Sequence, residues 1–258
     1  MSENASTKSL ALLITNDTLT FLTKTVQGTE EFYSEAINVN LPDLNEAVSY
    51  DLVEKEIKSN LPLLLYYNDV KICYISTPVT VVPNVHLSDN LSSFISLSNQ
   101  SKFEAETIKL KNVDASLVFN TYNPLNKVLN NLPNLKNGTT FHVGKFLIDN
   151  NRIDSEKNQI FVRLIKQKLE LCIYKKGVFT LYNVFDVTSD EDIVYYILNS
   201  LEQFNVDPNQ VYVSLEGGIT EDSIAYEHLA KYIQFIDFNR EIEAIGPKYL
   251  LYKIFECE

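Results

Sequence analysis

The order of elements that the sequence predicts occurs twice along this chain, and this repetition constrains the fold more than any single motif does. The first copy starts at Leu10 with three strand-like segments, continues with an apolar stripe at helical spacing, and ends in the strand-like run "DVKICYIST". The second copy starts at Ile160 with "QIFVRLIKQKLELCIYKKGVFTLYNVFDV", again three strand-like segments, followed by a helical pattern and a strand. A repeat of this length indicates a duplicated α/β unit, because the repeats of solenoid proteins are shorter.

Capping and turn residues place the boundaries within each copy. Asp43, three residues before Glu46, is predicted to cap the first helix. Ser189, three residues before Asp192, is predicted to cap the corresponding helix of the second copy, and Lys176-Gly177 is the expected turn of its hairpin.

Further elements are expected between and after these segments. Short helices are predicted at 88–97 and 123–132, strands at 115–122 and 139–149, a helix at 220–233 with Ala225, Leu229, Tyr232 and Ile233 facing inward, and a last strand, "QFIDF". Two sheets with helices packed on each are the economical arrangement. We divide the chain into a flexible N-terminus (1–8), a first lobe (9–155) and a second lobe (156–258).

The composition is that of a globular protein that does not bind nucleic acid. Hydrophobic residues make up 45% and charged residues 22% of the chain, and the formal net charge is −12. Basic residues are never more than two in a row, whereas binding to a phosphate backbone requires clustered Lys and Arg. Neither nucleic acid nor an anionic membrane surface is therefore an expected partner.

The N-terminal segment and the cysteines bear on location and on metal binding. "MSENASTK" lacks the basic start and apolar run of a signal peptide, and the apolar stretches are too short to span a bilayer, so we expect a cytoplasmic protein without membrane insertion. The cysteines and histidines are scattered, which argues against a disulfide framework and a metal site. Cys73 and Cys172 lie in apolar runs and are predicted to be core residues.

Two stretches resemble motifs of the actin-like ATPase superfamily, in which a ribonuclease-H-like unit is duplicated. "LELCIYKKGVFTLYNVF" is similar to the hairpin of the second lobe, and "VYVSLEGGIT" is similar to the strand and glycine turn that bind adenosine. Over nearly its full length the chain resembles the uncharacterised Bacteroidetes family known as domain of unknown function 3822, and its element order is similar to that of the pilus-assembly and cell-division branch of bacterial actin homologues. The resemblance implies an α/β protein with a duplicated ribonuclease-H-like (actin-like) fold, in which two mixed sheets carry flanking helices.

The resemblance also implies two phosphate-binding loops, and this chain departs from the pattern in both. The family's loops follow Asp-x-Gly, because the glycine lets backbone N–H groups approach phosphate oxygens and the Asp helps to hold magnesium-bound water. The first corresponding turn, residues 14–21, has Asp17 as its only carboxylate and no glycine. The second, residues 162–171, has Arg163 near the place of the acid and no glycine.

Glu216, Gly217 and Gly218 are the remaining candidates for nucleotide binding. A glycine pair between a strand and a helix can hold a nucleotide, and Glu216 can contact a ribose. The alternative, which we favour, is that the turn needs positive φ and close packing. No catalytic residue and no metal ligand is predicted. We expect no cofactor, and the less favoured alternative is that the protein binds ATP with magnesium.

These observations predict a non-catalytic actin-like protein that lacks the phosphate-binding loops and binds a protein partner or forms homo-oligomers. The contact would use the surface between the lobes or an exposed edge such as the C-terminal "KYLLYKIFECE". Dense aromatic pairs, such as Tyr66-Tyr67 and Tyr195-Tyr196, favour an interface. The alternatives are a diverged nucleotide-binding ATPase or small-molecule kinase of the same superfamily, and a homodimeric scaffold.

Overall fold

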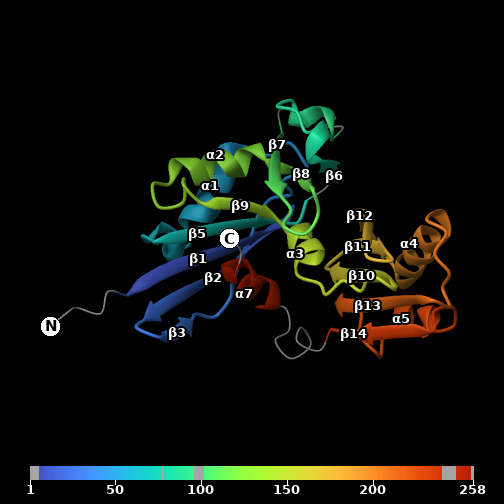
Figure 1. Ribbon diagram of the computed structural model, residues 1–258. Helices are drawn as coiled ribbons and strands as arrows, with labels where there is room; N and C mark the ends of the chain where they lie inside the picture. The colour runs from blue at the N-terminus through green and yellow to red at the C-terminus, as the bar shows by residue number, and fades with distance from the viewer. Residues whose placement is uncertain (1–5, 77, 96–101, 240–247, 257–258) are drawn as a thin grey trace.

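The computed structural model of the protein describes residues 6–76, 78–95, 102–239 and 248–256, and within them it contains three β-sheets with helices around them (Figure 1). A six-stranded sheet forms the centre of the first lobe, and a five-stranded sheet forms the centre of the second. A three-stranded sheet lies beside the six-stranded sheet.

The first sheet is mixed, with the strand order β3-β2-β1-β5-β9 and with β4 also paired to β2. Strand β1 is antiparallel to β2 and parallel to β5, and β5 is parallel to β9. The bounds are β1 (Thr7–Ile14), β2 (Thr18–Gln27), β3 (Glu30–Tyr33), β4 (Ile37–Asn40), β5 (Asp69–Tyr74) and β9 (Thr139–His142).

The second sheet repeats this topology in the order β12-β11-β10-β13-β14. Its first three strands form an antiparallel meander, and the fourth joins the first in parallel, with the fifth parallel to the fourth. The bounds are β10 (Asn158–Ile165), β11 (Lys168–Lys175), β12 (Val178–Asp186), β13 (Val211–Gly217) and β14 (Phe235–Phe238). The predicted duplication into two mixed sheets with flanking helices is confirmed.

The small sheet has the order β6-β8-β7 and separates β5 from β9 in the chain. Its strands are antiparallel: β6 (Val79–Pro83), β7 (Phe103–Lys109) and β8 (Ala115–Tyr122). It was not predicted as a separate sheet, although its strand at 115–122 was.

Helices cover both faces of the first sheet and one face of the second. Helices α1 (Tyr50–Lys58) and α2 (Asn123–Asn131) pack together over one face of the first sheet, and α7 (Tyr249–Glu256) packs on the opposite face against β1 and β5. Helices α4 (Asp190–Gln203) and α5 (Ile224–Leu229) cover the second sheet. The two sides of each strand serve different cores because successive side chains alternate between faces.

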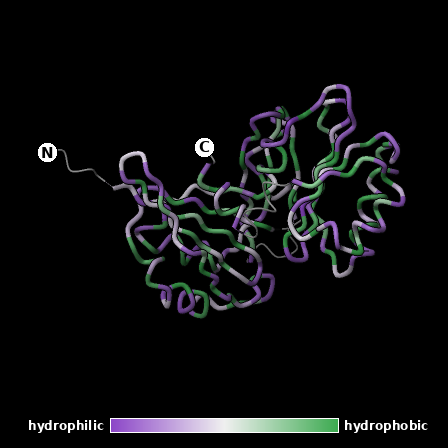
Figure 2. Tube along the Cα trace, turned by 90° about the horizontal axis from the view of Figure 1, so that it is seen from below, coloured by the Kyte–Doolittle hydropathy of each residue, from purple (hydrophilic) through white to green (hydrophobic). Residues whose placement is uncertain are grey.

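The free face of the second sheet completes the core of the first lobe. The largest apolar cluster joins residues of the first and small sheets to residues of the second sheet, namely Phe161, Cys172, Tyr174, Tyr182 and Val184. Figure 2 shows hydrophobic residues along the central strands of both lobes and hydrophilic residues in the outer turns. The lobes therefore share one apolar core.

Several predicted boundaries are confirmed. Ser189 caps α4 in a capping box with Asp192, and Lys176-Gly177 forms the β11–β12 turn with positive φ at both residues. Cys73 and Cys172 are buried.

The predicted cap of the first helix was wrong. Helix α1 begins at Tyr50, with Ser49 and not Asp43 as its cap, and the side chain of Ser49 accepts the N–H of Leu52. Asp43 instead accepts the backbone N–H of Asn45 at 3.0 Å and the side-chain amide of Asn16 at 3.1 Å. A short polar side chain caps a turn as readily as a helix.

Four other expectations need correction. The segment 88–97 has only a short 3₁₀ turn at Leu91–Ser93 in its described part, and the strand expected at 139–149 ends at His142, where helix α3 (Gly144–Asp149) follows. Helix α5 starts at Ile224 and not at residue 220, and Tyr232 is exposed.

The C-terminal segment is a helix and not an exposed edge. Leu250, Leu251 and Ile254 of α7 are buried against the first sheet.

The N-terminal segment that we expected to be flexible, residues 1–8, includes the first two residues of β1, Thr7 and Lys8. The boundary between the lobes at 155/156 stays a prediction. No helix among the described residues is long and apolar enough to cross a bilayer.

Candidate functional site at the seam between the lobes

The turn between β1 and β2 stands where the resemblance implies a first phosphate loop, and its hydrogen bonds are directed inward. The buried hydroxyl of Thr15 accepts the backbone N–H of Thr18 at 3.1 Å and donates to Asp17 Oδ1 at 2.8 Å. The N–H of Thr15 donates to Thr18 O at 2.9 Å. These N–H groups therefore stabilise the turn itself, whereas a phosphate loop presents its N–H groups to the ligand.

Lys166, in the turn between β10 and β11, closes the gap to the first turn. Its Nζ donates to Thr18 Oγ1 at 2.8 Å and lies 3.2 Å from Asp17 Oδ1. Both charged side chains are 52% exposed, so this clamp lies at the surface. Burial opposes ionisation of Asp17, but hydrogen bonds from Thr15 and Lys166 outweigh it and lower the pKa of Asp17. The two turns that would hold phosphates thus bind each other.

Beneath this clamp lies a buried charge network centred on Arg163. In the sheet register, Arg163 of β10 is directly opposite Glu170 of β11 and Glu216 of β13. Its Nε donates to Glu170 Oε2 at 2.5 Å, its Nη1 lies 3.2 Å from Glu216 Oε1, and its Nη2 donates to Val143 O at 2.8 Å. Because Val143 lies between β9 and α3, the guanidinium joins the second sheet to the first lobe.

The carboxylates of the network have further partners. Glu170 accepts the hydroxyl of Tyr182 at 2.6 Å, and Glu216 accepts the side-chain amide of Asn239 at 3.2 Å. Burial would lower the pKa of Arg163, but the two carboxylates outweigh it and raise that pKa. Burial raises the pKa of Glu216, with Arg163 opposing the shift. Arg163 therefore stays charged and holds both acids in place.

We call the contact between the lobes the seam; it consists of the clamp between Lys166 and the first turn and of the buried network around Arg163. His142 lies on the first-lobe side of the seam. Its Nδ1 accepts the N–H of Gly144 at 3.1 Å, which assigns the ring proton to Nε2, 3.1 Å from Ser76 O. Burial lowers the pKa of His142 to about 4, so the ring is neutral at physiological pH. Gly144 permits this close packing, because a Cβ there would lie 2.3 Å from the hydroxyl oxygen of Tyr182.

The structure places the three predicted site residues at the end of β13, a strand of the second sheet. Gly217 has a φ of +81°, and a Cβ at this position would lie 2.2 Å from Leu164 O. The N–H of Gly218 donates to the same oxygen at 2.8 Å. Glu216 faces Arg163 in the buried network. Both parts of the favoured explanation, positive φ and close packing, are present at Gly217, while nucleotide binding by these residues stays a prediction.

Sequence reasoning missed Glu170 and Lys166. The available signal was a single charged residue inside an otherwise apolar strand, as for Arg163 in "FVRLI" and Glu170 in "LELCIY", since a charge in such a run needs a buried partner. Chemically, the network has its guanidinium and both carboxylates engaged with one another. It binds β10, β11 and β13 to the first lobe and presents neither a free acid nor a free cation to a ligand.

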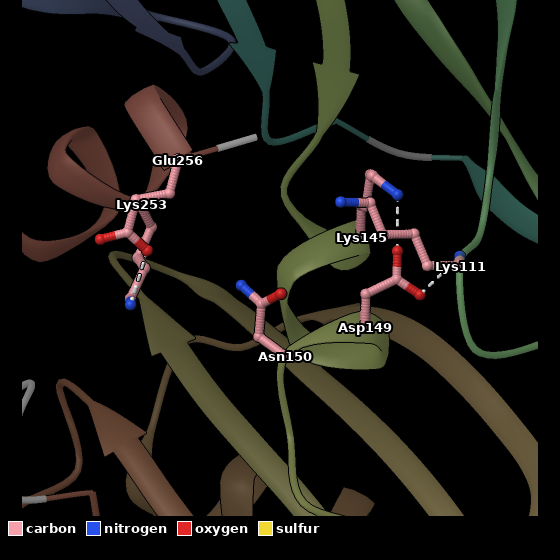
Figure 3. A pocket seen from close by; sticks show the side chains of 6 residues that line it. All are labelled: Lys111, Lys145, Asp149, Asn150, Lys253 and Glu256. Carbon is pink, nitrogen blue, oxygen red and sulfur yellow. Dashed lines mark hydrogen bonds and ion pairs between the residues drawn. The ribbon is translucent and has the colours of Figure 1, made fainter. Parts of the chain in front are cut away.

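A polar hollow lies beside α3 (Figure 3). This cavity of about 310 Å³ is lined by Lys111, Lys145, Asp149, Asn150, Lys253 and Glu256. Lys145 Nζ lies 2.5 Å from Asp149 Oδ2 and donates to Lys109 O at 3.1 Å, and Asp149 Oδ1 accepts the backbone N–H of Lys111 at 2.9 Å. These bonds tie α3 to the β7–β8 turn, which is a structural role.

Two solved structures are similar to this chain over nearly their whole length. One is a Bacteroides thetaiotaomicron protein with an actin-like ATPase fold and unknown function, with a TM-score of 0.79 and 14% identity over 97% of this chain and 96% of that one. The other is from a PilM–PilN type IV pilus biogenesis complex, with a TM-score of 0.56 and 10% identity over 95% and 96%. The predicted actin-like fold is therefore confirmed.

Comparison of the sequence with curated proteins finds no match. Comparison with family models finds one that covers residues 2–236 of the chain. The predicted family is therefore confirmed, and the chain belongs to the family described as "Protein of unknown function (DUF3822)".

Proposed function

We propose that this protein is a non-catalytic member of the actin-like fold that acts by binding another protein. The observation that carries the proposal is the closure of the seam: Lys166 joins the two turns that correspond to phosphate loops, and Arg163 joins the sheets beneath them. A nucleotide in this position would have to displace an ion pair and separate a shared apolar core.

Two further observations support a role in binding proteins. Large apolar side chains are exposed at several sites, among them Phe32, Tyr66 and Tyr195. One of the solved structures to which this chain is similar is described as a PilM–PilN type IV pilus biogenesis complex. A protein of the same fold can thus have another protein as its partner, and we extend that role to this chain.

Thermal melting with and without millimolar ATP and magnesium tests the first half of the proposal. We expect the same melting temperature in both conditions and no release of phosphate from ATP. A ligand at one hundred times its dissociation constant would stabilise the fold by about 2.7 kcal/mol, a shift of several degrees at this chain length. Such a shift would contradict the proposal and favour a diverged nucleotide-binding ATPase.

Light scattering coupled to size exclusion tests the second half. A homo-oligomer would identify this chain as its own partner, whereas a monomer requires a different protein. The two experiments are independent, because nucleotide binding and self-association are measured on the same sample by different signals.

A further inference from the structure

The outer edge of the first sheet is formed by β3 and β4, both of which pair with the same side of β2. We call residues 30–40 the edge segment. Strand β3 lies at the outer margin of the first lobe, on the side away from the second lobe (Figure 1). Within the described residues, no strand pairs with the outer side of β3 or β4.

The edge segment exposes large apolar side chains. Phe32 is 50% exposed, Tyr33 39% and Ile37 38%. Sheet edges that face water are usually protected by Lys, by Pro or by a covering element. The edge segment contains no Lys, Arg or Pro, and its charged residues are all Glu, so its side chains discourage pairing with an acidic strand but not with a basic one.

The register of β3 against β2 sorts its side chains onto two faces. Glu30 and Phe32 lie opposite Gln27 and Thr25 on one face, and Glu31 and Tyr33 lie on the other. Each face therefore carries one acid and, two residues later, one aromatic ring.

Tyr33 is held in place by its neighbours. Its ring is in edge contact with Tyr252 of α7 at a centroid distance of 4.9 Å, and its hydroxyl donates to Glu31 Oε2 at 2.7 Å. Burial and the carboxylate of Glu31 raise the pKa of Tyr33 to about 12. The aromatic part of the edge is thus preorganised, which reduces the entropic cost of binding.

The charge of this region selects the partner. The edge segment contains Glu30, Glu31 and Glu35, and Glu31 forms an ion pair with Lys24 of β2. A second copy of the chain would bring the same acids and a net charge of −12 to the contact. A partner strand with basic residues is complementary, and like charges across a strand pair are unfavourable.

We propose that the edge segment binds an extended basic and apolar segment of a partner protein as an additional antiparallel strand. In this arrangement two adjacent apolar residues of the partner lie opposite Tyr33 and Phe32, and the next two residues, both basic, lie opposite Glu31 and Glu30. The neighbouring pairs β2–β3 and β2–β4 are antiparallel, and strand addition of this kind gives affinity through main-chain hydrogen bonds and specificity through side chains. This inference rests on the proposed protein-binding function and names its surface.

Fluorescence polarisation with a labelled octapeptide, Ser-Thr-Val-Ile-Lys-Arg-Thr-Ser, tests the proposal. We expect saturable binding that weakens in high salt and about tenfold weaker binding of the matched peptide with Glu-Glu in place of Lys-Arg. Phe32→Ser and Glu30→Lys should each weaken binding of the basic peptide by about tenfold. Tyr66→Ser, which removes an exposed aromatic ring outside the edge segment, should leave the affinity unchanged.

Three results would overturn the proposal: equal affinity for the basic and acidic peptides, no binding of either, or wild-type affinity in Phe32→Ser. A dimer in light scattering that becomes monomeric in Phe32→Ser would also overturn it, because the occupant would then be a second copy. If the peptide experiment fails and ATP leaves the melting temperature unchanged, the edge segment is rejected as the binding surface, but the proposed non-catalytic function still stands. An ATP-induced shift would reject the non-catalytic function whatever the peptides do.

Discussion

The seam between the lobes and the outer edge of the first sheet place polar and apolar groups in opposite ways. At the seam, Arg163, Glu170 and Glu216 are buried and contact one another. At the edge, Phe32 and Tyr33 remain partly exposed although the adjoining strand is well packed. Buried charges persist only when they are paired, and exposed apolar edges favour contact with another chain. The difference supports our proposals that the seam holds the lobes together and that the edge segment binds a partner.

Arg163→Met is the largest expected perturbation and breaks the seam. It leaves two buried carboxylates without their cation, which should lower the free energy of unfolding by about 3–5 kcal/mol. The melting temperature should fall by roughly 10 °C. Arg152→Met, which removes an exposed arginine near the lobe junction, is the matched control and should change little.

The triple variant Arg163→Met, Glu170→Gln, Glu216→Gln separates charge from packing. If the loss in Arg163→Met comes from unpaired acids, the triple variant should recover part of the stability. A loss below about 1 kcal/mol in Arg163→Met itself would mean that the network does not hold the lobes together.

The pH dependence of stability is the next largest effect and also belongs to the seam. The pKa of His142 is about 4 in the folded protein and 6.5 as its ordinary value. As pH falls from 6.5 towards 4, the unfolded chain binds the proton first, so the folded state should lose about 3 kcal/mol over this window and nothing above it. Chemical denaturation at several pH values measures this loss.

His142→Gln should remove that part of the pH dependence, and the difference between it and the unmodified protein isolates the histidine from the carboxylates. His86→Gln, at an exposed histidine beside the small sheet, should retain the slope. An unchanged slope in His142→Gln would show that the ring is protonated or solvated in the folded state.

The fold was predictable from local patterns because each copy carries its own boundary signals. The Ser189–Asp192 capping box and the Lys176-Gly177 turn are formed by residues close in sequence, and both are confirmed. Asp43 failed because its side chain caps a turn through Asn45 and not a helix. Helix α7 was missed because a short run such as "YLLYKIF" is apolar at most positions and has no clear period.

The seam was predictable only in part. Arg163 was noticed at the place of the expected acid, but its partners lie on two other strands, β11 and β13. The short turn between β10 and β11 sets the register that brings Glu170 opposite Arg163, so this pair was within reach of local patterns. The contact with Glu216 depends on a parallel register between distant segments, which a single sequence does not specify. The clamp between Lys166 and Asp17 spans 149 residues and two lobes. Such contacts follow from the packing of the whole fold.

Lys166→Ala tests the exposed layer of the seam and should have a small effect. Because both charged groups are half-exposed, removing the clamp should cost less than about 1 kcal/mol, and high salt should reduce the difference further. The measurement is chemical denaturation in low and high salt. A cost as large as that of Arg163→Met would mean that the surface clamp, and not the buried network, holds the two turns together.

Phe32→Ser should have the smallest effect on stability and sharpens the contrast with the core. Phe21, on the adjacent strand β2, is fully buried, and Phe21→Ala should cost about 3–5 kcal/mol. Phe32 is half-exposed, so Phe32→Ser should cost less than about 1 kcal/mol while reducing aggregation at high protein concentration, because an apolar edge favours pairing with other chains. Chemical denaturation and light scattering measure the two effects. If Phe32→Ser costs as much as Phe21→Ala, the edge is part of the core, and its exposed rings do not indicate a binding surface.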